Sequence, residues 1–271
     1  LRLPFRAWAR HRERQGRARL MEGLLAYERG EHARAERLLA QAADAGDLEP
    51  VTRALAVRAA RANGDDASGE RHLAGLAQRH PAVRAVLSAE RALQAGDPAT
   101  ALAALDAAEA QPLPPRGLLL RGDALAALGR GWEAYGLLGA LRQQQAADAT
   151  TLEALQARWA EAGLQQAADA NALADRWDAL PPALRTMPAV VAAYARRAAA
   201  MGWHDAASGR LEDALDAGWD RTLVALYGSL PLARLEHRRT RLEQWLQARP
   251  SDPAALLAVA HVAQQQGHWP Q

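Results

Sequence analysis

Residues 29–39 read RGEHARAERLL and contain the three positions that predict the fold. Gly30 is followed five residues later by a small residue, Ala35, and nine residues later by Leu39. A glycine can end a helix in the left-handed conformation that a Cβ would penalise. The small residue then lets a second helix cross the first closely, and the leucine fills the space behind it. This stretch therefore predicts two antiparallel helices joined by a tight turn.

The same spacing recurs along the chain. Turn glycines are expected at positions 30, 64, 96, 129, 163, 202 and 267, which are 34, 32, 33, 34, 39 and 65 residues apart. The copy at Gly163 is weaker, because Ala168 and then Ala172 follow it where a leucine is expected. The last gap is close to two periods and indicates a degenerate copy near Leu226 to Trp245. A period of about 34 residues with helix–turn–helix content is the tetratricopeptide signature.

Composition agrees with an all-helical chain. The strong helix formers Ala, Leu, Arg, Glu and Gln are in excess, Ile is absent and Val is scarce. The predicted fold class is therefore all-α, a tetratricopeptide-like α-solenoid of about seven or eight antiparallel helix pairs in a right-handed superhelix. The pair opened by Gly267 is cut by the end of the sequence, which we interpret as a fragment.

Prolines predict how the array is divided. Pro181, Pro182 and Pro188 fall in the 39-residue gap, where about five extra residues lengthen a helix or loop. We expect a bend there, which would divide the array into two arms. A basic juxtamembrane lead into the first helix is predicted over residues 1–19. An N-terminal arm over residues 20–180 and a C-terminal arm over residues 181–271 follow, the last repeat of the latter being truncated.

Several classes of site are excluded or disfavoured. The chain has no cysteine, which excludes disulfides, thiol nucleophiles and Cys-ligated zinc. The eight histidines show no metal-ligand spacing, so no metal is predicted. The run from Gly129 to Ala134 matches GxGxxA, but it continues a helical pattern and not the strand that a dinucleotide site requires. With no catalytic constellation in view, we predict a protein that is not an enzyme.

The N-terminal segment is strongly basic. Residues 2–19 carry seven arginines and one acidic residue, interleaved with Phe5 and Trp8. A solvated helix start, attraction to anionic lipid headgroups and the positive-inside flank of an upstream membrane helix all fit this pattern. The start at Leu1 favours the flank, with the array on the cytoplasmic side. A net charge of +2 disfavours nucleic acid as a partner. The predicted membrane-face residues are Arg2, Arg6, Arg10, Arg12, Arg14, Arg17 and Arg19.

The concave surface of such an array is lined by the first helix of each pair. The repeat phase places five charged residues on it, and an arginine there can hold a carboxylate or an acidic peptide through two hydrogen bonds. Ordinary solvated charges are an equal alternative. The candidate groove residues are Arg58, Arg61, Glu90, Asp123 and Arg196.

The run from Arg10 to Leu39, an arginine-rich lead followed by LLAYERGEH at residues 24–32, resembles the HemY family. The likeness extends to the degenerate copy at residues 231–235 and to the helix and turn over Leu256 to Trp269. The resemblance implies two membrane helices upstream, a tetratricopeptide array on the cytoplasmic face of the bacterial inner membrane, and a role in late haem and porphyrin biosynthesis.

The function predicted from these observations is a membrane-tethered scaffold for protein–protein interaction that organises late haem-biosynthesis enzymes. No cofactor is predicted for it. A carrier that binds haem or porphyrin is one alternative, and a peptide-binding adaptor unconnected with haem is another.

Overall fold

The computed structural model describes residues 3–44, 48–231 and 233–265, with side chains from residue 11 onward except that of Ala108. Every regular element in these ranges is a helix, which confirms the all-α prediction. The chain forms two compact units, residues 1–124 and 125–271. The boundary predicted at residues 180 and 181 falls inside the second unit, and the two arms remain a prediction.

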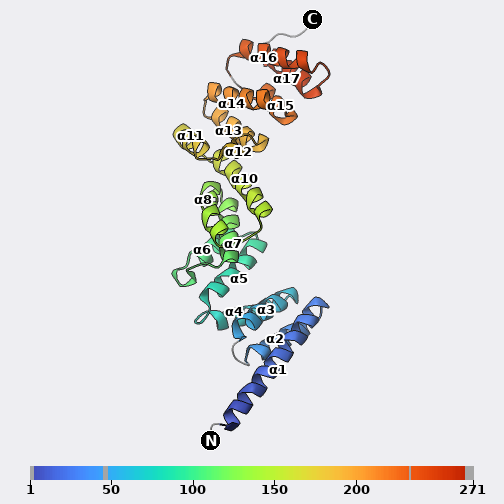
Figure 1. Cartoon of the computed structure of the whole chain (residues 1–271), viewed down its shortest axis with the longest axis vertical. Coiled ribbons are helices and arrows are strands. Elements are labelled where there is room, and N and C mark those ends of the chain that lie inside the picture. The colour runs from blue at the N-terminus through green and yellow to red at the C-terminus, as the bar shows by residue number, and fades with distance from the viewer. Residues whose placement is uncertain (1–2, 45–47, 232, 266–271) are drawn as a thin grey trace. The chain divides into compact units, whose positions relative to one another are not determined.

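The first unit is a succession of helices, coloured blue to green in Figure 1. Proline starts several of them, since its fixed φ suits the first helical turn, as at Pro81 and Pro98. The elements are α1 (Leu3–Glu28), α2 (His32–Ala43), α3 (Glu49–Ala62), α4 (Asp66–Leu76), α5 (Pro81–Gln94), α6 (Pro98–Asp106), the short 3₁₀ helix η1 (Ala108–Ala110) and α7 (Pro115–Ala127), which crosses the boundary between units.

The second unit continues in the same manner. Aspartate side chains cap helix N-termini here, as where Asp148 accepts from the Thr151 amide at 2.9 Å. The elements are α8 (Gly131–Gly136), α9 (Leu138–Gln143), α10 (Ala149–Gln165), α11 (Ala170–Asp178), α12 (Pro182–Arg185), α13 (Pro188–Ala200), α14 (His204–Ala217), α15 (Arg221–Ser229), α16 (Leu235–Ala248) and α17 (Pro253–Gln265).

One turn recurs five times between these helices. In its first copy the Gly30 amide donates to the Tyr27 carbonyl and the Glu31 amide donates to the Ala26 carbonyl, both at 2.9 Å. This pair of bonds closes the end of a helix and requires a left-handed residue, which glycine supplies. The prediction is confirmed at Gly30, Gly64, Gly96, Gly129 and Gly202, whose φ angles lie between 74° and 78°.

Gly163 is not a turn glycine, and that prediction was wrong. It lies inside α10, which continues to Gln165, and its backbone is not left-handed. A Cβ built on Gly163 would stand 2.9 Å from Cε3 of Trp132, so the glycine leaves room for that indole. Its small size therefore serves helix packing, and Ala168, predicted to be buried in the next helix, is exposed. The turn predicted at Gly267 lies outside the described residues.

The positions that follow each confirmed turn form the core. The small residue five positions after the glycine and the leucine nine positions after it are buried in every case, which confirms the packing role predicted for them. These residues are Ala35, Gly69, Ala101, Ala134 and Ala207, together with Leu39, Leu73, Leu105, Leu138 and Leu211. In the second unit, Ala207 and Leu211 belong to one cluster of buried residues that extends from Ala160 to Val262.

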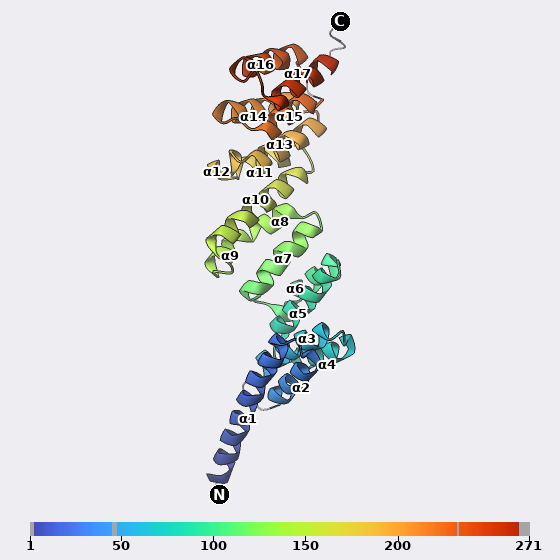
Figure 2. The same ribbon diagram turned by 90° about the vertical axis from the view of Figure 1, so that its right-hand side faces the viewer.

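Consecutive helices pack on one another in the first unit. Helix α1 lies along α2, as Figure 2 shows in blue, and α2 continues the contact to α3. Helix α3 then packs on α4, and α5 on α6. Contacts also skip one helix: α3 touches α5, and His72 of α4 lies 3.2 Å from Glu36 of α2. Helices that are separated by one helix in the chain therefore also contact each other.

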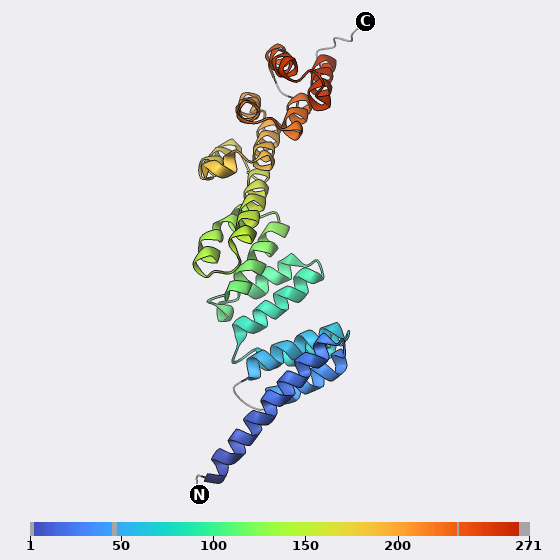
Figure 3. The ribbon, with the colours of Figure 1, turned by 45° about the vertical axis from the view of Figure 1, so that its right-hand side comes forward.

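In the second unit this alternation produces two rows of helices. Helices α10, α13, α15 and α17 form one row, in which each contacts the next. Helices α14 and α16 belong to the other row, where the Trp245 indole donates to Asp216 at 3.1 Å. Figure 3 shows both rows in yellow to red. Helices α15 and α16 occupy the place predicted for the degenerate copy, and their link contains a left-handed residue that is not glycine, Arg234, with φ 55°.

Candidate partner-binding surface

Three charged side chains join the alternate helices α3, α5 and α7. Arg58 of α3 donates from Nη2 to both carboxylate oxygens of Glu90 on α5, at 3.3 Å each. The same carboxylate accepts from Nε of Arg116, at the start of α7, at 3.1 Å. The Glu90 side chain is only 14% exposed, whereas Arg58 is 46% and Arg116 58% exposed. The two guanidinium groups thus cover a half-buried carboxylate and present positive charge outward.

Arg61 lies one turn further along α3 and acts differently. Its Nη1 donates to the main-chain carbonyl of Leu87 on α5 at 2.8 Å. The Nε and Nη2 atoms are buried, and neither has a hydrogen-bond partner among the described residues. Burial, and next the positive charge of Arg91, lower the pKa of Arg61 below its usual range. This arginine therefore links two helices and carries donors that the described residues leave unused.

The structure brings together only part of the predicted groove. Arg58, Arg61 and Glu90 lie on adjoining helices, and Asp123 is half-buried on α7. Arg196 is exposed on α13 in the second unit. Their assignment as a binding groove stays a prediction. Arg116 was not predicted, because its position at the first turn of α7 carries no repeat signal, although it completes the cluster around Glu90.

From residue 3 onward, the basic lead forms the first part of α1. Arg12, Arg14 and Arg17 are exposed, and Arg19 is half-buried. Arg12 donates to the main-chain carbonyl of Asp44, beyond the end of α2. Arg2 lies outside the described residues, as do the side chains of Arg6 and Arg10. Within the part of the chain that the structure describes, no helix is long and apolar enough to cross a membrane.

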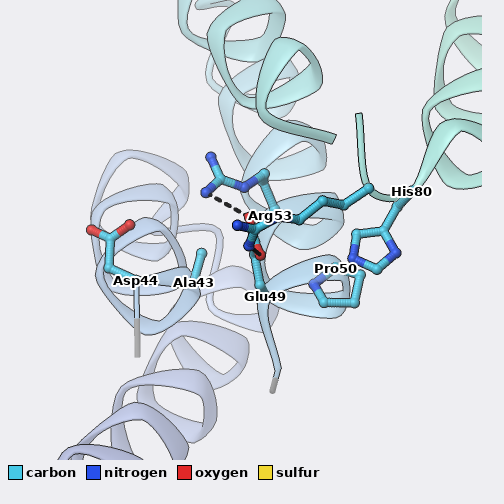
Figure 4. Close-up of a pocket in the computed structure, with 7 residues that line it drawn as sticks. Ala43, Asp44, Glu49, Pro50, Arg53 and His80 are labelled. Carbon is cyan, nitrogen blue, oxygen red and sulfur yellow. Dashed lines mark hydrogen bonds and ion pairs between the residues drawn. The ribbon is translucent and has the colours of Figure 1, made fainter. Parts of the chain in front are cut away.

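A polar pocket of about 570 Å³ opens between the end of α2, the start of α3 and the link from α4 to α5 (Figure 4). Its floor is Glu49, whose carboxylate accepts from Arg53 and from Arg79, each at 3.1 Å. His80 and Pro50 line one side, and Asp44 lines the other. Since the two guanidinium groups share one carboxylate, the pocket is a second place where arginine faces outward in the first unit.

No group of three or more His, Asp or Glu side chains that could hold a metal ion occurs in the described ranges. The GxGxxA run begins in the turn between α7 and α8, where Gly129 has φ 74° and ends a helix, and continues into α8. Its glycines therefore serve the turn and the close packing of α8 on α10, where a Cβ on Gly131 would approach Ala162 at 2.6 Å.

Comparison with protein families gives one match. The family model described as HemY protein N-terminus matches residues 1–64, a range that contains the basic lead, α1, the first confirmed turn, α2 and α3. No curated protein and no solved structure matches the chain. This match over the N-terminal segment supports a HemY-family protein and points to an association with haem biosynthesis and with the membrane.

Proposed function

We propose that this chain is a non-catalytic, membrane-tethered scaffold, built on a tetratricopeptide-like solenoid, that binds enzymes of late haem biosynthesis. The observation that carries the proposal is the row of alternate helices. Helix α3 touches α5 in the first unit, and α10, α13, α15 and α17 follow one another in the second. Stacked helix pairs of this kind offer an extended side-chain surface, which suits a protein segment better than a single small substrate.

Arginine on the row favours acidic partners. Arg58 and Arg116 cover Glu90 but remain about half exposed, and Arg196 is exposed on α13. A guanidinium group already held in place by one carboxylate can still donate to a second one, and its planar shape suits two parallel hydrogen bonds. We therefore expect the recognised segments of the partners to carry aspartate or glutamate.

The N-terminal arginines support a tether on the cytoplasmic face of the inner membrane. Arg14 and Arg17 are exposed on α1 and make no ion pair with a described residue. Each basic residue near an anionic surface contributes about 1 kcal/mol. Replacing both by glutamine should lower the partitioning of the protein into phosphatidylglycerol vesicles roughly 30-fold. An unchanged partition coefficient would count against a lipid-facing role for these two residues.

Photo-crosslinking in native membranes tests the scaffold directly. A photoreactive amino acid would replace Arg196 on the row α10–α13–α15–α17 of the full-length protein. The matched control would replace Arg239, an exposed arginine on α16 in the other row. We expect late haem-biosynthesis enzymes to be recovered through position 196 and not through position 239. Recovery of other proteins alone, with none of these enzymes, would overturn the scaffold and favour a general adaptor.

A titration with haem distinguishes a haem or porphyrin carrier from a scaffold. Added to the purified protein, haem should give no saturable shift of its Soret band if the chain is a scaffold only. A shift that saturates at a fixed stoichiometry would favour the carrier.

A further inference from the structure

The second unit contains a short element that the repeat does not require. From Gly129 to Gly202 the chain runs 73 residues, which is two 34-residue periods and five more. The extra length forms α12 and the turns on either side of it. Leu184 in α12 is buried in the core, so the element is held against α13. An insertion fixed in this way changes the local surface of the unit.

The inserted element forms one wall of a pocket of about 770 Å³. The C-terminal half of α14, the start of α15 and the end of α11 form the other walls. This volume lies in the range of about 300–1,000 Å³ that is usual for small-molecule sites. The lining residues are Trp177, Pro182, Arg185, Thr186, Pro188, Arg210, Asp213, Ala214, Ala217, Gly218, Trp219, Asp220 and Leu223.

Two tryptophans give the pocket apolar walls that are held firmly. Trp177 lies between Tyr194, whose ring centroid is 4.6 Å away, and the guanidinium of Arg210, which is 5.5 Å from the indole centroid. The Trp219 indole donates to Asp252 at 3.3 Å and is covered by Arg249 at 4.3 Å. Because these contacts fix both indoles before any ligand arrives, little conformational entropy is lost on binding.

Two arginines and two aspartates line the pocket, and Arg185 is the arginine that makes no ion pair with a described residue. Asp213 pairs with Arg210 at 3.7 Å, and Asp220 accepts from the Leu223 amide at 2.9 Å, capping α15. Arg185, in α12, makes no ion pair with any described residue, and its Nε is buried with no hydrogen-bond partner there. A half-buried guanidinium of this kind attracts a carboxylate strongly.

We propose that this pocket binds a small amphipathic carboxylate: one carboxylate held by Arg185, on a flat apolar body that packs between the proline and tryptophan walls. A carboxylate can pair with the Arg185 guanidinium, which no described carboxylate contacts, while Asp220 is already engaged as the cap of α15, and the apolar lining matches a body of aromatic or aliphatic carbon. The inference does not rest on the scaffold function, because the pocket can hold a small carboxylate whether or not the row of helices binds proteins, although α15 and the start of α13 contribute to both.

Isothermal titration calorimetry with 2-naphthoate and its neutral analogue 2-naphthalenemethanol tests the proposal on the full chain. We expect one saturable site for 2-naphthoate, with the alcohol binding about tenfold more weakly, since an ion-assisted hydrogen bond contributes at least this much. Arg185→Gln should weaken naphthoate binding about tenfold and leave the alcohol unchanged. The matched control, Arg239→Gln on α16, should bind both probes as the wild type does.

A second variant tests the location of the binding site without changing a charge. Ala217 is exposed at the end of α14 and lines the pocket, so Ala217→Trp should fill it and abolish binding of both probes while circular dichroism stays unchanged. Three outcomes would overturn the proposal: no saturable naphthoate binding by the wild type, equal affinity for acid and alcohol, or naphthoate binding that survives both Arg185→Gln and Ala217→Trp.

Discussion

Trp132 of α8 lies on Gly163 of α10, close enough that a Cβ on the glycine would stand 2.9 Å from Cε3 of the indole. The glycine is buried in the last turn of α10 and has no left-handed backbone, so its conformational freedom is not used there. Arg176 covers the other side of this contact, with its guanidinium 5.7 Å from the Trp132 ring centroid and a hydrogen bond to the Gly163 carbonyl. Close packing of α8 on α10 therefore depends on the absence of a side chain at residue 163.

Replacing Gly163 by alanine should destabilise the second unit. The added methyl group overpacks the contact with Trp132, and we expect the free energy of unfolding to fall by about 1–3 kcal/mol. Gly209 in α14 is the matched control, since nothing lies within 4 Å of a Cβ there and its φ is not positive. Gly209→Ala should raise stability by about 1 kcal/mol through helix propensity. Urea denaturation followed by circular dichroism measures both, and equal effects would contradict the packing argument.

Replacing Gln145 by glycine should stabilise the protein. It ends α9 with φ 50° and repeats the turn of the five glycines: its amide donates to Arg142, and the Ala146 amide donates to Leu141. A side chain in this conformation costs about 1–2 kcal/mol, which exceeds the entropic cost of glycine. Gln145→Gly should therefore raise the thermal midpoint. Gln144→Gly, at an ordinary φ of −87°, should lower it, and the reverse order would disprove the explanation.

Asp252 should make the C-terminal helices sensitive to acid. Burial acts to raise its pKa, but hydrogen bonds from the Ala255 and Ala254 amides, Arg221 and Trp219 outweigh it and hold the pKa below the usual range. The stabilisation from a lowered pKa is present above the unfolded value of about 3.9 and is lost as the pH falls through the folded value. Between pH 7 and pH 3 the thermal midpoint of the wild type should fall further than that of Asp252→Asn. If the thermal midpoints of the wild type and the variant fall by the same amount, Asp252 is not the origin of the acid sensitivity.

Tyr227 should have the opposite pH dependence. Burial, followed by a hydrogen bond from its hydroxyl to Glu212 at 2.7 Å, raises the pKa of this phenol above its ordinary range. Its contribution to stability is complete below the unfolded pKa of about 10 and declines as the pH rises above that value. Tyr227→Phe should therefore lose less of its thermal midpoint between pH 8 and pH 11 than the wild type does. Identical losses would show that this phenol is not linked to unfolding.

The repeat could be predicted because it is a local property of the chain. Gly30, Ala35 and Leu39 lie within ten residues of one another, and the turn that they form needs little beyond its own backbone hydrogen bonds. Gly163 has the same residue type at a fitting spacing, yet it lies within a helix and packs against Trp132, 31 positions away. Sequence spacing alone does not distinguish a glycine that turns the chain from one that admits an indole.

The residues of the candidate site also divide into those that local sequence spacing predicts and those that it does not. Arg58 and Glu90 were placed on one surface by the repeat phase, because each lies at a fixed distance from its own turn. Arg116, which completes their cluster, begins a helix after a proline-rich link whose path has no period to follow. The pocket residues Arg185 and Trp219 lie in an insertion and in a loop, where neither period nor helix phase applies.

By itself, the sequence determined that the chain is helical, where five of its turns fall and which small residues and leucines enter the core, because helix propensity and turn geometry act over a few residues. The tertiary structure alone decided that Gly163 lies within a helix, that two arginines share Glu90, and that the insertion at α12 forms one wall of a pocket beside Arg185, which makes no ion pair with a described residue. Those outcomes depend on distances between side chains far apart in the chain, which are set only when neighbouring helices pack.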